Sequence, residues 1–473
     1  ANLTSTSSNG ATYIQEENAI TINSMSSSDN LVLTTKNGSI TTGTITATGS
    51  ILLEANDTDN NETFDITLNA DVTSSTGSIT ITADHDIFQN TDITADTNIS
   101  LTATNDAINM QDGKSIVSTN GGDILLTAKT NIYLSALSTT GDATLTANEG
   151  AITDNLTAET PNIIADDLVL SALYGIGAFG NDEINTTVAT LNATNGASGG
   201  DIYIRETDTL IITGISQTSN GIVNIITTLG DITQSGNIST TTGAITIASV
   251  AGSIAMNDNT STTSSANINL NAATNITTET LSTTTDISLN ATDGYIQDRD
   301  ASSLITAATL SLNAGTNIAT SSNHLNTNVA NLTSTSSNGA TYIQEENTIT
   351  INSMNATNGE LVLATTNGSI ATIGTITASG NILLQSGDIG TNTHDITLGA
   401  NVTSSSGSIT ITADNAIIQN ENIVASTDIT LTATTGTITM TDGKNITSTT
   451  GDINLNAETN IALSILNTTG DVF

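Results

Sequence analysis

A 25-residue segment occurs twice in this chain, almost verbatim, and this repetition constrains the fold more than any other feature. Ala1–Met25 returns as Ala330–Met354, and the single difference is Ala19 in place of Thr348. A looser copy spans Val188–Ile215. Copies of this kind are typical of a solenoid, in which each segment adds one more layer to a stack. We therefore expect one continuous β-solenoid over residues 1–473, an excerpt of a longer repeat protein, with super-repeat copies that start near residues 1, 189 and 330.

Short phrases of alternating aliphatic and polar residues predict the strands. In Gly77–Asp84, the alternation places Ile79 and Ile81 on one face of a strand and two threonines on the other. Strong phrases recur about every 20 residues, separated by Asn-Gly and Thr-Gly turn signals, and no helical period is present. The prediction is an all-β, right-handed parallel β-helix of roughly 20–23 residues per coil. We expect glycine and asparagine at its corners, where a positive φ is required.

Composition narrows the range of partners. The chain has 6 basic and 46 acidic residues and a formal charge of −40, which excludes binding to nucleic acid phosphates as a main role. The absence of cysteine excludes disulfides and thiolate metal sites. No run of about 18 apolar residues is present, so we expect no membrane span. The favoured interpretation of the acidity is solubility and resistance to side-by-side aggregation, and the alternative is divalent-cation binding or a saline habitat.

Nothing in the sequence indicates an enzyme. The basic residues are scattered, and two of them, Lys114 and Lys444, occupy equivalent places in two copies. The best local group of titratable residues is Asp298 and Asp300 around Arg299, which a local ion pair explains equally well. We therefore expect no catalytic and no cofactor-binding residues.

Metal binding has one candidate. Asp57, Asp59 and Asp65 offer oxygen ligands at a spacing that resembles the start of a calcium loop, within Glu54–Asp65, the longest departure from the strand pattern. Glu62, however, stands where an EF-hand loop requires glycine, so a solvated acidic loop at a corner is the favoured interpretation. The three histidines, His85, His324 and His394, share no spacing, and zinc is not expected. We predict no metal ligands, with Ca²⁺ at these aspartates as the alternative.

Three tyrosines occupy equivalent places in the copies. Tyr13, Tyr203 and Tyr342 are each followed by isoleucine and then by an acidic patch. We expect these rings to cover the core, and the alternative is a platform for a ligand. With aromatic residues at 2% and no tryptophan, a site that stacks on sugar rings is poorly provided for.

Several phrases carry a family resemblance. Phrases of the form G-x-I-x-L-x-A, followed by Gly175-Ile-Gly, Val188-Ala-Thr-Leu and the Gly-Gly-Asp-Ile-Tyr-Ile-Arg-Glu segment at 199–206, resemble the repeat region of filamentous-haemagglutinin-type exoproteins. Those are long bacterial surface adhesins, many exported by two-partner secretion, whose repeats form right-handed parallel β-helices. The resemblance covers essentially the whole chain and specifies fold more than function.

The resemblance implies a structural shaft of an extracellular or cell-surface fibre. Its partners would be a host or neighbouring cell surface, or glycans, contacted through regions outside this segment. Two alternatives stay open. One is a self-assembling filament or sheath subunit whose partner is its own copy, end to end or laterally. The other is a polysaccharide-binding or polysaccharide-cleaving β-helix protein.

Overall fold

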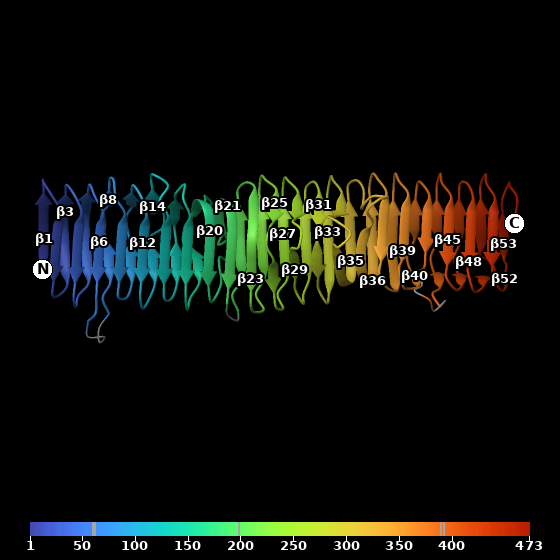
Figure 1. Cartoon of the computed structure of the whole chain (residues 1–473), viewed down its shortest axis with the longest axis horizontal. Coiled ribbons are helices and arrows are strands. Elements are labelled where there is room, and N and C mark those ends of the chain that lie inside the picture. Colours follow the sequence, from blue (N-terminus) through green and yellow to red (C-terminus); the bar gives the residue numbers. More distant parts are fainter. Residues whose placement is uncertain (59–62, 197–198, 388–389, 391–392) are drawn as a thin grey trace. The chain divides into compact units, whose positions relative to one another are not determined.

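The chain forms a parallel β-solenoid of about 22 turns with roughly 21 residues each, which confirms the predicted all-β parallel β-helix (Figure 1). The computed structural model describes all residues except 59–62, 197–198, 388–389 and 391–392, and the described residues contain no helix. Contacts divide the chain into two units. Unit 1 comprises Ala1–Ile232 and Gly236–Gly243, and unit 2 comprises Thr233–Ser235 and Ala244–Phe473.

Each regular turn contains one five-residue strand and two three-residue strands. In unit 1, β9 (Ile79–Ala83) is followed by β10 (Ile87–Gln89) and β11 (Ile93–Ala95), and β12 (Ile99–Ala103) then pairs in parallel with β9. Equivalent strands of successive turns therefore form columns. There is one five-residue column and there are two three-residue columns, and every backbone ladder runs from one turn to the next.

The core consists of aliphatic residues that lie above one another in these columns. Ile79 pairs with Ile99, and Ile81 pairs with Leu101. These side chains are at most 1% exposed, whereas the threonines between them face outward. The recurrent phrase I-x-L-x-A is thus the inward face of the five-residue column, which explains why 2% aromatic content suffices for such a thin core.

The columns of unit 1 continue through most of its strands. The five-residue column contains β2 (Thr12–Glu16), β4 (Leu31–Thr35), β6 (Ile51–Ala55), β9, β12, β15 (Ile124–Ala128) and β18 (Ala143–Ala147). One three-residue column contains β7 (Ile66–Leu68), β10, β13 (Ile108–Met110), β16 (Ile132–Leu134) and β19 (Ile152–Asp154). The other contains β8 (Val72–Ser74), β11, β14 (Ser115–Ser118) and β17 (Ala136–Ser138). Longer strands precede them, namely β1 (Asn2–Ser7), β3 (Ile20–Ser27) and β5 (Ile40–Ala47), and β5 pairs with both β7 and β8.

At one point in unit 1, the chain moves its strands from one column to another. The long strands β20 (Ile163–Ala172) and β21 (Ile184–Asn195) run from a three-residue column into the five-residue column. The column of β19 continues through Ile176, which forms parallel β-bridges with Ile152 of β19 and with Ile202 of the five-residue strand β22 (Ile202–Glu206). Strand β24 (Val223–Thr227) then pairs with β22. The eight-residue β23 (Leu210–Gln217) lies on β21, and β26 (Ile238–Thr240) pairs with β23. We call this exchange a column switch. It coincides with the start of a sequence copy, because β21 contains residue 189.

Unit 2 repeats this plan with its own column switch at β35 (Leu304–Ala314), β36 (Leu325–Ser336), β37 (Thr341–Glu345) and β38 (Ile349–Ala356). Before the switch lie β27 (Ile245–Ser249), β28 (Ile254–Met256), β29 (Ser261–Thr263), β30 (Ile268–Ala272), β31 (Ile276–Thr278), β32 (Thr280–Ser282), β33 (Asp286–Ala291) and β34 (Ile296–Asp298). After it, the five-residue column contains β39 (Leu361–Thr365), β42 (Ile382–Gln385), β45 (Ile409–Ala413), β48 (Ile429–Ala433) and β51 (Ile453–Ala457). The shorter columns contain β40 (Ile370–Thr372), β43 (Ile396–Leu398), β46 (Ile417–Gln419), β49 (Ile438–Met440) and β52 (Ile461–Ala462), and β41 (Ile376–Ala378), β44 (Val402–Ser404), β47 (Ile423–Ala425), β50 (Asn445–Ser448) and β53 (Ile465–Asn467). Strand β25 (Ile232–Gln234) lies where the two units meet in the sequence.

The expected role of corner glycines and asparagines is confirmed at some corners, since nine described glycines and Asn259 have a positive φ, but it does not account for the others. Most corner glycines have a negative φ, and a Cβ atom would instead collide with the backbone of the turn below, as at Gly77 beside Ser50. Among the described asparagines only Asn259 has a positive φ. Corner asparagines act through their side chains, because Oδ1 of Asn98 accepts the N–H of Asp123 one turn later at 3.0 Å. Most corners therefore require a glycine that lets the backbones of successive turns approach closely, or an asparagine whose side chain accepts a backbone N–H, more than they require a left-handed backbone conformation.

Candidate functional site

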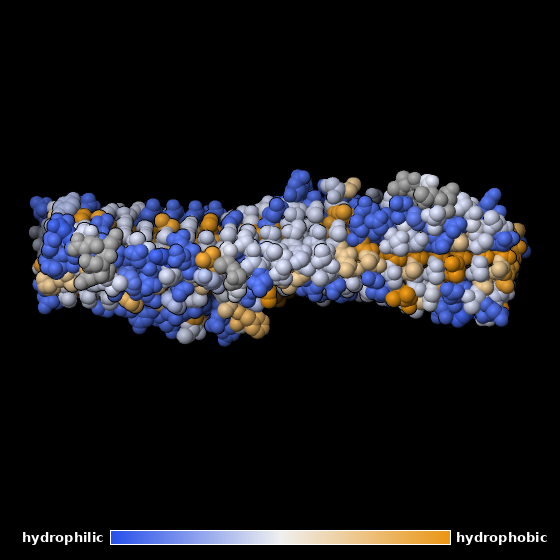
Figure 2. All heavy atoms as spheres, turned by 90° about the horizontal axis from the view of Figure 1, so that it is seen from below, coloured by the Kyte–Doolittle hydropathy of each residue, from blue (hydrophilic) through white to orange (hydrophobic). Residues whose placement is uncertain are grey.

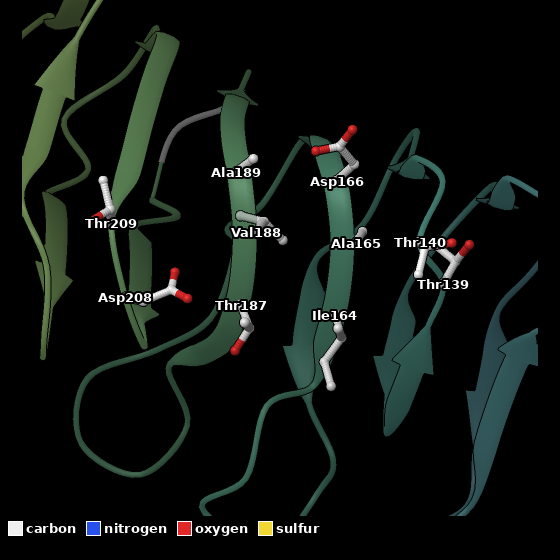
Figure 3. A pocket seen from close by; sticks show the side chains of 10 residues that line it. All are labelled: Thr139, Thr140, Ile164, Ala165, Asp166, Thr187, Val188, Ala189, Asp208 and Thr209. Carbon is white, nitrogen blue, oxygen red and sulfur yellow. The ribbon is translucent and has the colours of Figure 1, made fainter. Parts of the chain in front are cut away.

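A groove of about 690 Å³ lies at the column switch of unit 1 (Figure 3). Figure 3 shows Val188 and Ala189 of β21 between Asp166 of β20 and Asp208, which follows β22. The described lining consists of Thr139, Thr140, Ile164, Ala165, Asp166, Thr187, Val188, Ala189, Asp208 and Thr209. This lining holds no aromatic or basic side chain. The groove therefore offers hydroxyl groups and two carboxylates on opposite sides of an apolar floor, without an aromatic ring on which a ligand could stack.

A fully buried glutamate lies beside each column switch. In unit 1, Oε2 of Glu206 accepts the hydroxyl of Thr186 at 2.6 Å and the N–H of Val188 at 3.1 Å. In unit 2, Glu345 accepts the hydroxyl of Thr327 at 2.7 Å and the N–H of Val329 at 3.1 Å. Each carboxyl group thus satisfies the backbone where a long strand bends between columns. Burial raises the pKa of both side chains, and it raises the pKa of Glu345 to about 7.

Replacement of Glu345 by glutamine is expected to change how stability depends on pH. A carboxyl group with a pKa of about 7 when folded and 4.5 when unfolded holds a proton in the native state between these values. The free energy of unfolding therefore falls as pH rises from about 4.5 to about 7 and levels off above, by on the order of a few kcal/mol. Glu345→Gln removes this loss, so denaturant unfolding at pH 5 and pH 8 should find the variant less pH-dependent than the wild type.

The control for this prediction is Glu16→Gln. Glu16 ends β2 at the equivalent place of the first copy, and its side chain is partly exposed. This variant should keep the wild-type pH dependence. If the free energies of unfolding of the wild type and Glu345→Gln changed equally between pH 5 and pH 8, the buried carboxyl group would not titrate in this range.

A local ion pair is one explanation for the acidic residues around Arg299, but the ion pair that this side chain forms is not local. Arg299 instead pairs with Asp258 two turns below and donates to the carbonyl of Met256 at 3.0 Å. Asp298 points into the core, where its Oδ2 accepts the N–H of Asn326 at 2.7 Å, and burial raises its pKa to about 7. Asp300 is exposed and accepts from Ser302. The two carboxylates therefore point to different environments and do not form an acid–base pair.

The three equivalent tyrosines differ in their surroundings. Tyr203 is buried and packs edge-on against Phe179 at 6.1 Å between ring centroids, as expected for a ring that covers the core. Tyr13 is 70% exposed. Tyr342 stacks on His324 at 5.6 Å and donates its hydroxyl to Glu360 at 2.5 Å, and burial raises its pKa to about 12. The described residues thus provide no shared tyrosine platform.

A cluster of one histidine and three aspartates lies at a corner of unit 1. His85 Nδ1 is 3.4 Å from Asp65 Oδ1 and 3.2 Å from Asp86 Oδ2, and its Nε2 is 3.3 Å from Asp106 Oδ2. Side-chain exposures of 16–35% place the cluster at a half-buried surface. Burial raises the pKa of Asp86, and the neighbouring Asp106 carboxylate adds to this effect. One ligand atom each from Asp65, His85 and Asp86 lies within 4.8 Å of the others, which is compatible with a shared metal ion.

The predicted calcium ligands lie only partly within the described residues. Asp59 and Glu62 lie outside them, so the alternative of a calcium loop stays a prediction. The backbone of Asp57 forms an isolated antiparallel β-bridge with that of Asn37 in the preceding turn. Asp65 belongs to the His85 cluster.

Comparison with family models, with curated proteins and with solved structures gave no significant match. In the described part of the chain, no helix long and apolar enough to cross a membrane is found.

Sequence reasoning missed the His85 cluster, although a signal was present. Asp65 and Asp86 are one turn apart, and each lies directly before the first residue of a strand in the same column. The spacing of the three histidines along the sequence does not reveal the cluster, because neighbours in a solenoid are found one turn away. An alignment of successive turns would have placed His85 among the three aspartates.

Proposed function

We propose that this chain is a non-enzymatic structural shaft segment of a long extracellular or cell-surface fibre. The observation that carries this proposal is the unbroken ladder of parallel strands within each unit, in which every turn is hydrogen-bonded to the next. Such stacking distributes load over backbone hydrogen bonds and an aliphatic core, and stability grows with each added turn.

The surface properties support the same proposal. Figure 2 shows hydrophilic and near-neutral residues over most of the visible face, with apolar residues in smaller areas. Together with the charge of −40, such a surface disfavours lateral association of shafts. The resemblance to filamentous-haemagglutinin-type repeats points to bacterial adhesins as the class of fibre. Binding to cells or glycans would then belong to other regions of the parent protein.

Antibody labelling of intact source cells tests this proposal. An antibody against the chain should label unpermeabilised cells, with immunogold particles on fibres that extend from the surface. Labelling that appears only after permeabilisation would contradict it.

Sedimentation of the purified chain separates the alternatives, because a shaft segment stays monomeric whereas a filament subunit polymerises in a fixed register. Release of oligosaccharides from a pooled glycan digest would establish the polysaccharide-cleaving alternative and overturn the non-enzymatic role.

A further inference from the structure

The His85 cluster gathers residues from three successive turns. Asp65 precedes β7, His85 and Asp86 precede β10, and Asp106 lies shortly before β13. Two of the carboxylates are fixed by the backbone of the next turn. Asp65 Oδ1 accepts the N–H of Asp86 at 3.0 Å, and Asp86 Oδ1 accepts the N–H of Ala107 at 3.2 Å. The second oxygen of Asp86 is thereby held beside the imidazole.

The imidazole faces carboxylate oxygens on both sides, which leaves one side of a neutral ring without a hydrogen to donate. A neutral histidine carries one N–H, and a carboxylate only accepts. When Nε2–H donates to Asp106, the Nδ1 lone pair of His85 meets oxygens of Asp65 and Asp86. Either a second proton, which makes the imidazole itself the cation, or a metal ion between the three acceptors satisfies this arrangement, and the three ligand atoms lie within 4.8 Å of one another, as a shared metal ion requires. Among the described ion pairs, none brings a lysine or arginine to these three carboxylates.

Unit 2 shows how the same corner is built without this convergence of acceptors. Asp395 is the counterpart of Asp65, but Asn415 and Ala416 stand at the places of His85 and Asp86. The amide of Asn415 donates to Asp395 Oδ1 at 2.8 Å, so the carboxylate has a neutral donor. The corner therefore folds without a histidine or a second carboxylate, and the cluster of unit 1 is not a requirement of the solenoid.

We propose that Asp65, His85 and Asp86 bind a divalent transition-metal ion of the zinc class, with Asp106 as the positioning residue. His85 Nδ1 and one oxygen from each aspartate supply the three protein ligands, and water completes the coordination. Nε2–H donates to Asp106, which sets the tautomer that presents Nδ1 to the metal, as carboxylates do beside metal-bound histidines. The bound ion ties two successive turns together directly and the third through Asp106.

Calorimetric titration of the metal-free chain with Zn²⁺, and separately with Ca²⁺, tests this proposal. We expect one Zn²⁺ per chain and much weaker Ca²⁺ binding, since the imidazole nitrogen favours transition metals. Imidazole ¹H–¹⁵N spectra should show the signals of His85 shifting with the first equivalent of Zn²⁺. His324, stacked on Tyr342, and His394, beside Asn367, serve as internal controls and should not shift.

The matched variant is His85→Asn combined with Asp86→Ala, which copies the residues of unit 2. It should keep the far-ultraviolet spectrum and lose the Zn²⁺ site. Asp106→Asn retains all three ligands and should weaken Zn²⁺ binding by ~10-fold. Equal Zn²⁺ binding by the wild type and the double variant would overturn the proposal, as would Ca²⁺ binding as tight as Zn²⁺ binding or equal shifts of all three histidines. Each of these results would show that the cluster is only part of a non-specific acidic surface.

Discussion

Alanine in place of Ile81 is expected to lower the free energy of unfolding of its turn by about 2–5 kcal/mol, the range for large-to-small changes in a close-packed core. Ile81 is fully buried in β9, between Leu53 of β6 and Leu101 of β12. Few atoms can move into the cavity, because each neighbouring side chain is itself held by the next turn. This is one of the two largest effects that we expect from a single substitution.

The damage from Ile81→Ala should nevertheless stay local. In a solenoid each turn contacts only its neighbours, so strands several turns away keep their own packing. Amide hydrogen exchange should become faster in β6, β9 and β12 and stay unchanged in β18. Thr80→Ala, on the outward face of the same strand, is the control and should alter exchange little. Loss of protection throughout unit 1 in a single step would contradict the nearest-neighbour picture.

Alanine in place of Gly374 is expected to be about as damaging, for the opposite reason. Gly374 lies between β40 and β41, where both pair with the eight-residue strand β38. A Cβ atom there would lie 1.6 Å from the carbonyl oxygen of Asn352 in the turn below. Overpacking costs about 1–3 kcal/mol and occasionally more, and we expect the upper end because the obstacle is backbone that other turns hold in place.

The same obstacle recurs at the equivalent glycines of the other copies. A Cβ atom at Gly236 would lie 1.8 Å from the oxygen of Thr213, and one at Gly43 would lie 2.1 Å from that of Asn23. Denaturant unfolding of Gly374→Ala should show the loss, and Gly196→Ala is the control. The contact nearest to a Cβ atom at Gly196 is the flexible side chain of Leu173 at 3.3 Å. Equal stability of the two variants would show that the turns slide past one another more easily than the ladder implies.

The strands and the turn length could be predicted from the sequence because they depend on local patterns. The alternation through Ile79 and Ile81 determines which side chains face inward, and the spacing of such phrases determines the length of a turn. The column switches could not be predicted in this way. They depend on where a long strand such as β21 bends between columns, and a buried side chain such as Glu206 stabilises that bend from the following turn.

The candidate sites were harder to predict than the fold. Closeness in sequence suggests that Asp65 acts with Asp57 and Asp59, whereas the structure brings Asp65 to His85 one turn away. Arg299 likewise pairs with Asp258 two turns below and not with its sequence neighbours. In a solenoid, side-chain neighbours are separated by whole turns, so a site becomes visible only when the length of each turn is known.

Distances between spin labels test the central claim, the stacking of successive turns, most directly. The chain has no cysteine, so labels can be attached at chosen outward positions. Gln15 is separated from Thr102, Thr146 and Thr194 by four, six and eight pairing steps within unit 1. At ~4.8 Å per step the account predicts label separations of ~19, ~29 and ~38 Å. Distances that do not grow in proportion to the number of turns would contradict it.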